Sequence, residues 1–242
     1  MNTLAVQELD DRVVVTLRRP EARNAMNAAM VGELHEVCAS LEERPRFLLL
    51  TGDGGTFAAG ADIGELRQRG REQALQGINS RLFDRIARLP LPTVAAVDGY
   101  ALGGGAELAY ACDIRLASPS AVFGNPEPGL GILAAAGACW RLRELAGASV
   151  AKQVLLAGRR LDADDALRFG LVAEVVPAGD LLKRAHELLD RMGRSGQLAL
   201  RLTKLVADGG GHPLTDDLAQ AILFESAEKA ERMDAFLAGG RS

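Results

Sequence analysis

Residues 93–109 constrain the fold of this chain more than any other part of the sequence. They begin with an apolar run of small and β-branched residues, which is typical of a buried strand. The run ends at Asp98 and Gly99, and three consecutive glycines, Gly103 to Gly105, follow. A helix-forming segment then carries Glu107 in its first turn. The sequence therefore predicts a strand, a tight glycine corner, and a helix that begins at the glycines.

This glycine corner also has a chemical implication. The first N–H groups of a helix have no intrahelical acceptor, and residues without side chains let another molecule approach them. Such donors attract an oxyanion. With Glu107 a turn away, they are the groups needed to enolise or hydrate a carbonyl compound. On this stretch alone a structural role is equally consistent, in which the glycines permit close strand–helix packing and Glu107 is solvated.

Composition narrows the class of protein. Of the 242 residues, 48% are hydrophobic and 25% are charged, as in soluble globular proteins. The formal net charge of −4 and the scattered basic residues argue against a nucleic-acid partner. The N-terminus has no basic-then-apolar signal sequence, and no apolar run approaches the roughly 18 residues of a membrane span. We therefore expect a cytoplasmic protein without a membrane partner.

The three cysteines give no sign of a disulfide framework or a zinc site. Cys38, Cys112 and Cys139 are odd in number and have no CxxC spacing. We expect buried free thiols and no metal.

Strands dominate the first half of the chain and helices the second. Residues 4–9 and 12–17 alternate between apolar and polar positions around two aspartates, which predicts an antiparallel hairpin. Asn27 is the predicted N-cap of a helix that runs to about residue 44. Further strands are expected at 47–50, 93–97, 113–117, 121–124 and 172–176, and further helices at 72–89, 132–145, 150–157, 163–169, 181–192, 197–207 and 214–237.

Several motifs in register resemble the enoyl-CoA hydratase/isomerase (crotonase) family. The matching segments are residues 57–63, 95–109, 112–114 and 123–127, with weaker matches at 19–25, 158–163 and 166–172. Their order and spacing hold over almost the whole chain. Linked motifs in register are much more specific than any one motif alone.

The resemblance implies a catalytic role for four residues. The N–H groups of Ala61 and Gly104 would form the oxyanion hole for a thioester carbonyl. Glu107 and Glu127 match the two glutamates that hold the attacking water in hydratases. Glu107 would act chiefly as the base toward that water, and Glu127 would supply the proton to the α-carbon. Two carboxylates beside an apolar pocket need separated pKa values to divide these roles.

A second set of residues is implied to bind coenzyme A. The adenine would rest on backbone carbonyls of one loop, and the thioester would lie along a second loop and the start of the glycine-corner helix. These residues are Ala22, Arg23, Ala25, Ala59, Ala61, Asp62, Ile63 and Gly104. Coenzyme A enters as the carrier of the substrate, and no further cofactor is implied.

The two glutamates favour one activity within the family. Isomerases that move a double bond commonly keep a carboxylate at the Glu127 position and lose the one at Glu107. We therefore expect an enoyl-CoA hydratase that adds water to a trans-2-enoyl-CoA, in a setting such as fatty-acid β-oxidation. A Δ3-Δ2-enoyl-CoA isomerase or another acyl-CoA lyase is the alternative, followed by an acyl-CoA-binding subunit that has lost catalysis.

Residues 134–142 depart from the pattern of the hydratases. Typical hydratases have a Pro-Gly-x-Gly-Gly-Thr-Gln-Arg-Leu stretch here, whereas this chain has alanines, Gly137, Cys139 and Trp140. The change lines the region near the reacting water with methyl groups and an indole. Trp140 would either wall the acyl pocket or lie in the core.

The family resemblance also implies an architecture. We expect an α/β fold, a spiral of β-β-α turns that forms two sheets, followed by a helical C-terminal region that drives trimerisation. The spiral, with both the coenzyme A site and the active site, would span residues 1–185, and the oligomerisation region residues 186–242. The expected assembly is a homotrimer or a dimer of trimers.

Overall fold

Two sheets organise the computed structural model of the chain, which describes residues 1–209 and 213–238. The larger sheet has the strand order β1-β2-β3-β4-β6-β9 and the smaller one the order β5-β7-β8. The strands are β1 (Leu4–Glu8), β2 (Arg12–Leu17), β3 (Phe47–Gly52), β4 (Thr93–Val97), β5 (Tyr100–Leu102), β6 (Ile114–Ala117), β7 (Val122–Gly124), β8 (Leu161–Asp162) and β9 (Glu174–Val175).

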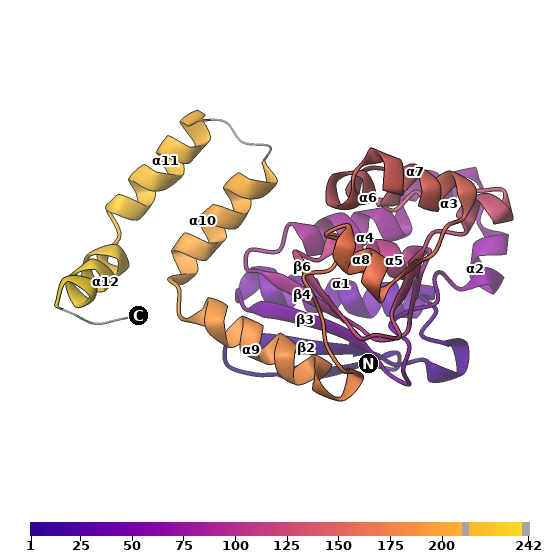
Figure 1. The fold of residues 1–242 in the computed structure, drawn as a ribbon, viewed down its shortest axis with the longest axis horizontal. Helices are drawn as coiled ribbons and strands as arrows, with labels where there is room; N and C mark the ends of the chain where they lie inside the picture. The colour runs from indigo at the N-terminus through magenta and orange to yellow at the C-terminus, as the bar shows by residue number, and fades with distance from the viewer. Residues whose placement is uncertain (210–212, 239–242) are drawn as a thin grey trace.

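Most helices follow strands and cover the sheets (Figure 1). They are α1 (Ala28–Glu43), α2 (Ile63–Gln68), α3 (Arg71–Gln76), α4 (Ile78–Ala87), α5 (Gly104–Ala111), α6 (Ala138–Ala146), α7 (Ala148–Ala157), α8 (Ala163–Arg168), α9 (Leu181–Gly193), α10 (Gln197–Asp208), α11 (Pro213–Phe224) and α12 (Ala227–Leu237), with 3-10 turns η1 (Pro20–Ala22), η2 (Glu127–Leu130) and η3 (Ala178–Asp180).

The predicted N-terminal hairpin is confirmed. Strands β1 and β2 pair antiparallel, with Leu4 opposite Leu17, and all the other pairings in the larger sheet are parallel. Asn27 caps α1 as expected, because its side-chain oxygen accepts the N–H of Met30 at 2.9 Å.

The larger sheet is covered on both faces, and β4 shows how. Its side chains alternate, so that Ala95 and Val97 pack into the main core while Val94 and Ala96 pack into a second cluster. The second cluster includes Leu181 and other apolar residues of α9. A parallel strand that is buried on both sides needs this continuous apolar sequence. Figure 1 shows α9 on the opposite side of the sheet from α4 and α5.

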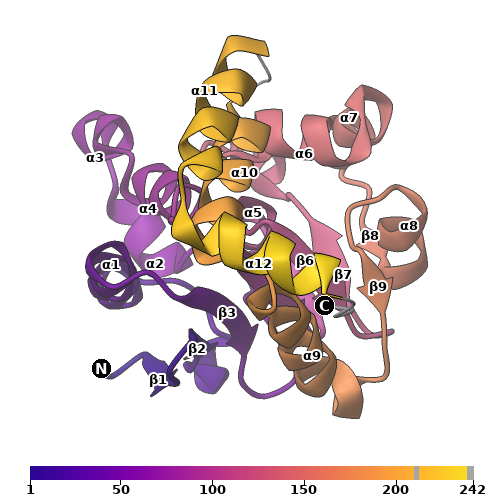
Figure 2. The same ribbon diagram turned by 90° about the vertical axis from the view of Figure 1, so that its left-hand side faces the viewer.

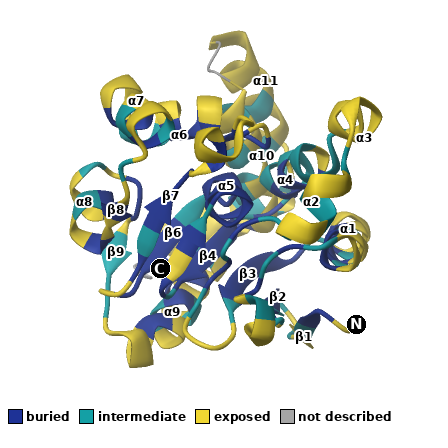
Figure 3. Ribbon diagram, turned by 90° about the vertical axis from the view of Figure 1, so that its right-hand side faces the viewer, coloured by how far each residue is buried: buried dark blue, intermediate teal, exposed yellow. Residues whose placement is uncertain are grey.

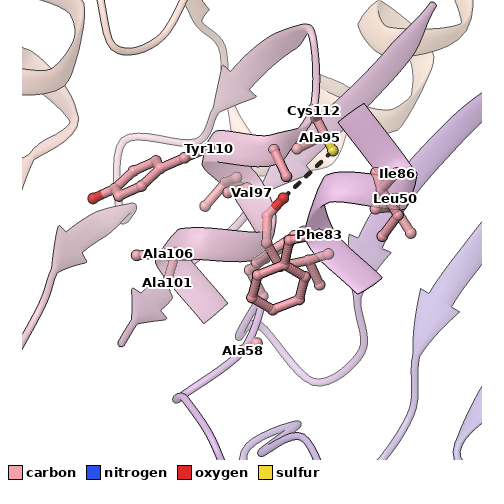
Figure 4. Packing of buried hydrophobic residues seen from close by; sticks show 14 of the residues in the cluster. Leu50, Ala58, Phe83, Ile86, Ala95, Val97, Ala101, Ala106, Tyr110 and Cys112 are labelled. Carbon is pink, nitrogen blue, oxygen red and sulfur yellow. Dashed lines mark hydrogen bonds between the residues drawn. The ribbon is translucent and has the colours of Figure 1, made fainter. Parts of the chain in front are cut away.

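The main core holds α5 in place. Residues of both α4 and α5 belong to this core, among them Phe83, Ile86, Ala106 and Tyr110, which Figure 4 labels. Every residue of α5 is buried, and Figure 3 shows this helix and β4 as the buried centre of the molecule. The start of α5, with its glycines and Glu107, is therefore on a rigid support.

Two long predicted helices are each divided by a break. The helix expected at 72–89 is split into α3 and α4 by Gly77, whose φ of +61° is in the left-handed region. The helix expected at 214–237 is likewise α11 and α12, because the chain turns and Ser226 starts a new helix by accepting the N–H of Lys229.

The prediction of a helix over residues 132–145 is wrong for the first half of that range. Helix α6 begins only at Ala138, and residues 131–137 form an irregular loop. Gly137 has a φ of +129°, which a helix does not allow. The loop matters for the site described below.

The expectation of three buried thiols is correct for two of them. Cys38 and Cys112 are buried free cysteines, whereas Cys139 is exposed. Among residues 1–209 and 213–238, no helix is long and apolar enough to cross a membrane. The same residues contain no group of three or more His, Cys, Asp or Glu side chains that could hold a metal ion.

The C-terminal helices α10 to α12 extend to one side of the α/β body (Figures 1 and 2). None of the three contains a buried residue, whereas α9 has four. The predicted division after residue 185 falls inside α9, whose apolar residues pack on the sheet. The division itself stays a prediction.

Candidate active site

One cavity of about 420 Å³ lies at the start of α5. All four residues predicted to be catalytic line it: Ala61, Gly104, Glu107 and Glu127. They come from segments that are far apart in sequence, and the fold brings them to the same wall.

The N–H groups of Ala61 and Gly104 have no acceptor among the residues that the structure describes. Met26 pairs with the peptide groups on either side of Ala61: its N–H donates to Gly60 O, and its carbonyl accepts from Asp62 N. This leaves the N–H of Ala61 out of the pairing. Gly104 is the first residue of α5, where an N–H has no helical partner.

A side chain on Gly104 would crowd the two free N–H groups. A β-carbon built on it would lie 2.9 Å from Cε of Met26 and 3.6 Å from N of Ala61. It would fill the space beside both free N–H groups. The neighbouring Gly105 is required for packing, because its β-carbon would lie 2.2 Å from the carbonyl oxygen of Ala58. The structural and chemical interpretations of the glycine corner are therefore compatible. Gly105 allows the close packing, and Gly104 leaves the two N–H groups accessible.

Glu107 is buried, with only 3% of its surface exposed, and the expectation of a solvated side chain does not hold. Its Oε1 accepts two backbone hydrogen bonds, from N of Ala136 at 2.8 Å and N of Ala138 at 3.1 Å. Burial raises its pKa to about 7, and these two hydrogen bonds oppose the rise. The carboxyl group can therefore gain or lose a proton near neutral pH.

The loop that holds Glu107 was missed by the sequence prediction. Its alanines read as helix, yet residues 136–138 turn two N–H groups toward the carboxylate. Gly137 between them was the available signal. Arg141 supports the loop from α6, since it donates to Ala136 O at 3.4 Å and to Asp84 of α4 at 2.7 Å.

Glu127 begins the 3-10 turn η2, between Pro126 and Pro128. Behind it, Tyr110 donates to Oδ1 of Asn125 at 3.4 Å, and Asn125 donates to Gly103 O at 3.4 Å. Glu127 Oε2 is buried and has no hydrogen-bond partner among the described residues. Burial raises the pKa of Glu127 as well.

Apolar side chains form much of the remaining wall, with Leu66, Ile78, Ile132, Leu133 and Ala135 as examples. The methyl-lined region expected near residues 134–136 is therefore present. The two expectations for Trp140 are both wrong, because it does not line this cavity and is 47% exposed. Its ring stacks on the guanidinium of Arg141 at 4.0 Å instead.

The two loops expected to hold coenzyme A lie side by side. Ala59 N donates to Arg23 O at 3.0 Å, and Met26 N donates to Gly60 O at 2.8 Å. Asp62 caps α2 through the N–H groups of Gly64 and Glu65, and it pairs with Arg19 at 3.2 Å. Ala25 lies on the first of these loops, Ala22 ends the 3-10 turn η1 just before it, and Ile63 is the first residue of α2, directly after the second loop. That these residues bind coenzyme A stays a prediction.

Comparison with known proteins shows which family has this combination of fold and cavity. A sequence model described as enoyl-CoA hydratase/isomerase matches residues 11–231. The chain belongs to the enoyl-CoA hydratase/isomerase family. A short-chain-enoyl-CoA hydratase of Clostridium acetobutylicum is 38% identical over 93% of this chain and 87% of its own length. A crotonyl-CoA hydratase of Syntrophomonas wolfei is 35% identical over 97% of this chain and 94% of its own.

Solved structures of this family have the same fold. A crystal structure of an enoyl-CoA hydratase from Bacillus anthracis superposes with a TM-score of 0.92 at 32% identity, over 98% of this chain and 96% of the other. The predicted crotonase-like α/β fold with a helical C-terminal region is confirmed.

Burial of Glu107 has a consequence for stability that can be measured. Its pKa in the folded protein lies above the ordinary 4.5, so the wild type loses stability as pH rises from about 4.5 to about 7. Glu107→Gln keeps an oxygen for the two N–H groups but cannot ionise. We expect this variant to be more stable than the wild type by about 3 kcal/mol at pH 8, since one pKa unit corresponds to about 1.4 kcal/mol. At pH 4.5 the difference should disappear.

Chemical denaturation at the two pH values measures this difference. Glu36→Gln, at an exposed position on α1, is the matched control and should show no such pH dependence. A Glu107→Gln variant whose stability relative to the wild type is the same at both pH values would show that the carboxyl group ionises without cost in the folded state.

Proposed function

We propose that this member of the family is an enoyl-CoA hydratase that adds water across the double bond of a trans-2-enoyl-CoA to give a 3-hydroxyacyl-CoA. The observation that carries the proposal is the cavity itself, where two buried carboxyl groups face two peptide N–H groups that have no acceptor. Relatives named hydratases at 35–38% identity support it.

The free N–H groups of Ala61 and Gly104 would receive the thioester oxygen. As water attacks C3, negative charge moves through the double bond to this oxygen, and both N–H groups stabilise it. Donors that are fixed before the reaction need not reorganise, and each typically lowers the barrier by about 2.7–4 kcal/mol. Position 1 of α5 also places the oxygen at the positive end of the helix dipole.

The two glutamates would divide the proton transfers. Ionised Glu107 takes a proton from the water molecule while the water oxygen bonds to C3. Protonated Glu127 gives a proton to C2. Oε1 of Glu107 is held by two N–H groups, which leaves Oε2 for the water. The buried Oε2 of Glu127 has no other described partner and would serve the substrate carbon. The mechanism uses no metal or redox cofactor.

Burial raises the pKa of both carboxyl groups, to about 7 for Glu107. The proposed division needs one proton on the pair, carried by Glu127 when the substrate reacts, so that one group is the base and the other the acid. The product leaves the pair with the proton moved to Glu107 and lost from Glu127. A proton exchange through solvent or between the two groups then restores the starting state.

Coenzyme A would lie along the paired loops at residues 22–25 and 59–63, and its acyl chain would enter the cavity. The apolar wall provided by α2 to α4 and the 131–136 loop suits a hydrocarbon chain. Because Asp62 is engaged as a helix cap and an ion-pair partner, its contribution would be to shape the loop that carries Ala61.

Hydration is tested by the loss of ultraviolet absorbance when crotonyl-CoA is mixed with the protein. We expect turnover by the wild type and a fall in kcat of about 10²–10⁴-fold in Glu107→Gln and in Glu127→Gln, the usual cost of losing a general acid or base. Glu36→Gln should match the wild type. Turnover of a 3-enoyl-CoA without hydration of any 2-enoyl-CoA would contradict the proposal and fit an isomerase. Binding without any turnover would fit a lapsed acyl-CoA-binding subunit.

We also propose that the chain assembles as a homotrimer or a dimer of trimers through its C-terminal helices. Leu218, Ile222 and Phe224 of α11 and Phe236 of α12 are 52–70% exposed in the single chain. Such an apolar surface on a helical arm is typical of an interface. A second copy of the chain would cover it.

Light scattering after size-exclusion chromatography measures this assembly. The wild type should have the mass of three or six chains, and a Leu218→Asp, Ile222→Asp double variant should shift toward one chain. Gln220→Asp, an exposed polar position on the same helix, should keep the wild-type mass. A monomeric wild type would contradict the proposal.

A further inference from the structure

Asn79 has a polar group in the cavity that the mechanism above does not use. Its Oδ1 is buried and has no hydrogen-bond partner, and no partner is present for its Nδ2 among the residues that the structure describes. Asn79 is half-buried and lines the cavity. Only three buried side-chain polar atoms in the described part of the chain lack a partner, and two of them, Asn79 Oδ1 and Glu127 Oε2, belong to residues of this cavity.

The position of the amide relative to Gly104 is informative. A β-carbon built on Gly104 would lie 3.4 Å from Nδ2 of Asn79 and 3.6 Å from N of Ala61. Nδ2 of Asn79 and N of Ala61 therefore both lie beside the first residue of α5, in a space that Cε of Met26 also borders, at 2.9 Å from the same point.

The support beneath Asn79 is rigid. It is the second residue of α4, which starts directly after the left-handed Gly77. Leu82 and Phe83, one turn further on, and Ile86, two turns on, anchor α4 in the main core that also holds α5. Figure 4 labels Phe83 and Ile86. The amide and the first turn of α5 are thus held by the same packed pair of helices, as a preorganised donor requires.

We propose that the side-chain amide of Asn79 is a third donor of the oxyanion site. Its Nδ2 donates to the thioester oxygen together with the N–H groups of Ala61 and Gly104. The inference rests on the proposed function, because it extends the oxyanion site of the same reaction. It makes Asn79 a catalytic residue, since the amide touches the oxygen on which charge develops.

Two substitutions separate this role from packing. Asn79→Leu keeps the size of the side chain and removes the donor. Asn79→Asp keeps the shape and replaces the donor with an acceptor oxygen. Arg81→Ala, at an exposed position of the same helix, is the control that should behave as the wild type.

The first measurement is the steady-state hydration of crotonyl-CoA. A donor that acts mainly on the transition state changes kcat and leaves KM nearly unchanged. We expect Asn79→Leu to lower kcat by about 100-fold, the lower end for one oxyanion donor. Asn79→Asp should lower it further, because the carboxylate repels the developing charge.

The second measurement needs no turnover. Difference infrared spectroscopy of bound butanoyl-CoA with a ¹³C-labelled carbonyl reports how strongly the thioester oxygen is hydrogen-bonded. We expect the wild type and Arg81→Ala to lower the carbonyl frequency equally, and Asn79→Leu to lower it by less. Equal shifts in the wild type and Asn79→Leu, with equal kcat, would overturn the assignment of Asn79.

The two measurements also distinguish this inference from the proposed function. A wild type that shifts the carbonyl through Asn79 but hydrates no enoyl-CoA would contradict the hydratase while supporting the third donor. A wild type that hydrates crotonyl-CoA, with a carbonyl shift that does not depend on Asn79, would support the hydratase and contradict the third donor.

Discussion

The burial of the Glu107 carboxyl group is the interaction on which the site depends. A buried carboxyl group without partners would simply remain protonated, and one in water would ionise at its ordinary pKa. Here desolvation raises the pKa, and two backbone N–H groups from residues 136–138 restrain the rise. The result is a group that titrates near neutral pH. Because the N–H of Ala136 donates to Glu107, it is not available to a helical carbonyl.

Close packing of small residues makes this burial possible. Helix α5 is buried over its whole length, and Gly105 lies against the backbone of Ala58, on the segment that leads to Ala61. A larger side chain at position 105 would push α5 away from this segment and so separate the N–H groups of Ala61 and Gly104. The tight packing therefore holds the backbone around these N–H groups rigidly. The same packing keeps the ionisable side chain of Glu107 inside the protein, which lowers stability. This exchange of stability for activity is common at enzyme sites.

The sequence alone was sufficient to predict those features that depend on local residue patterns or on several motifs in register. Alternation gave the β1–β2 hairpin, side-chain capping gave Asn27, and the motifs in register placed Ala61, Gly104, Glu107 and Glu127 in one site. It was insufficient where tertiary contacts decide. The alanines at 134–138 favour a helix, but the N–H groups of Ala136 and Ala138 donate to Glu107 instead. Asn79 lies in a pattern that reads as one continuous helix, and only the break at Gly77 and the packing of α4 bring its amide beside Gly104.

The central claim is that Glu107 ionises near neutral pH because it is buried. It is tested most directly by following the carboxyl ¹³C signals of glutamate-labelled protein through a pH titration, in the wild type and in Glu107→Gln. The account predicts a wild-type signal that titrates near pH 7 and is absent from the variant. A Glu107 signal that titrates near its ordinary value of 4.5 would contradict it, because the carboxyl group would then be ionised throughout the neutral range and burial would have no effect on it.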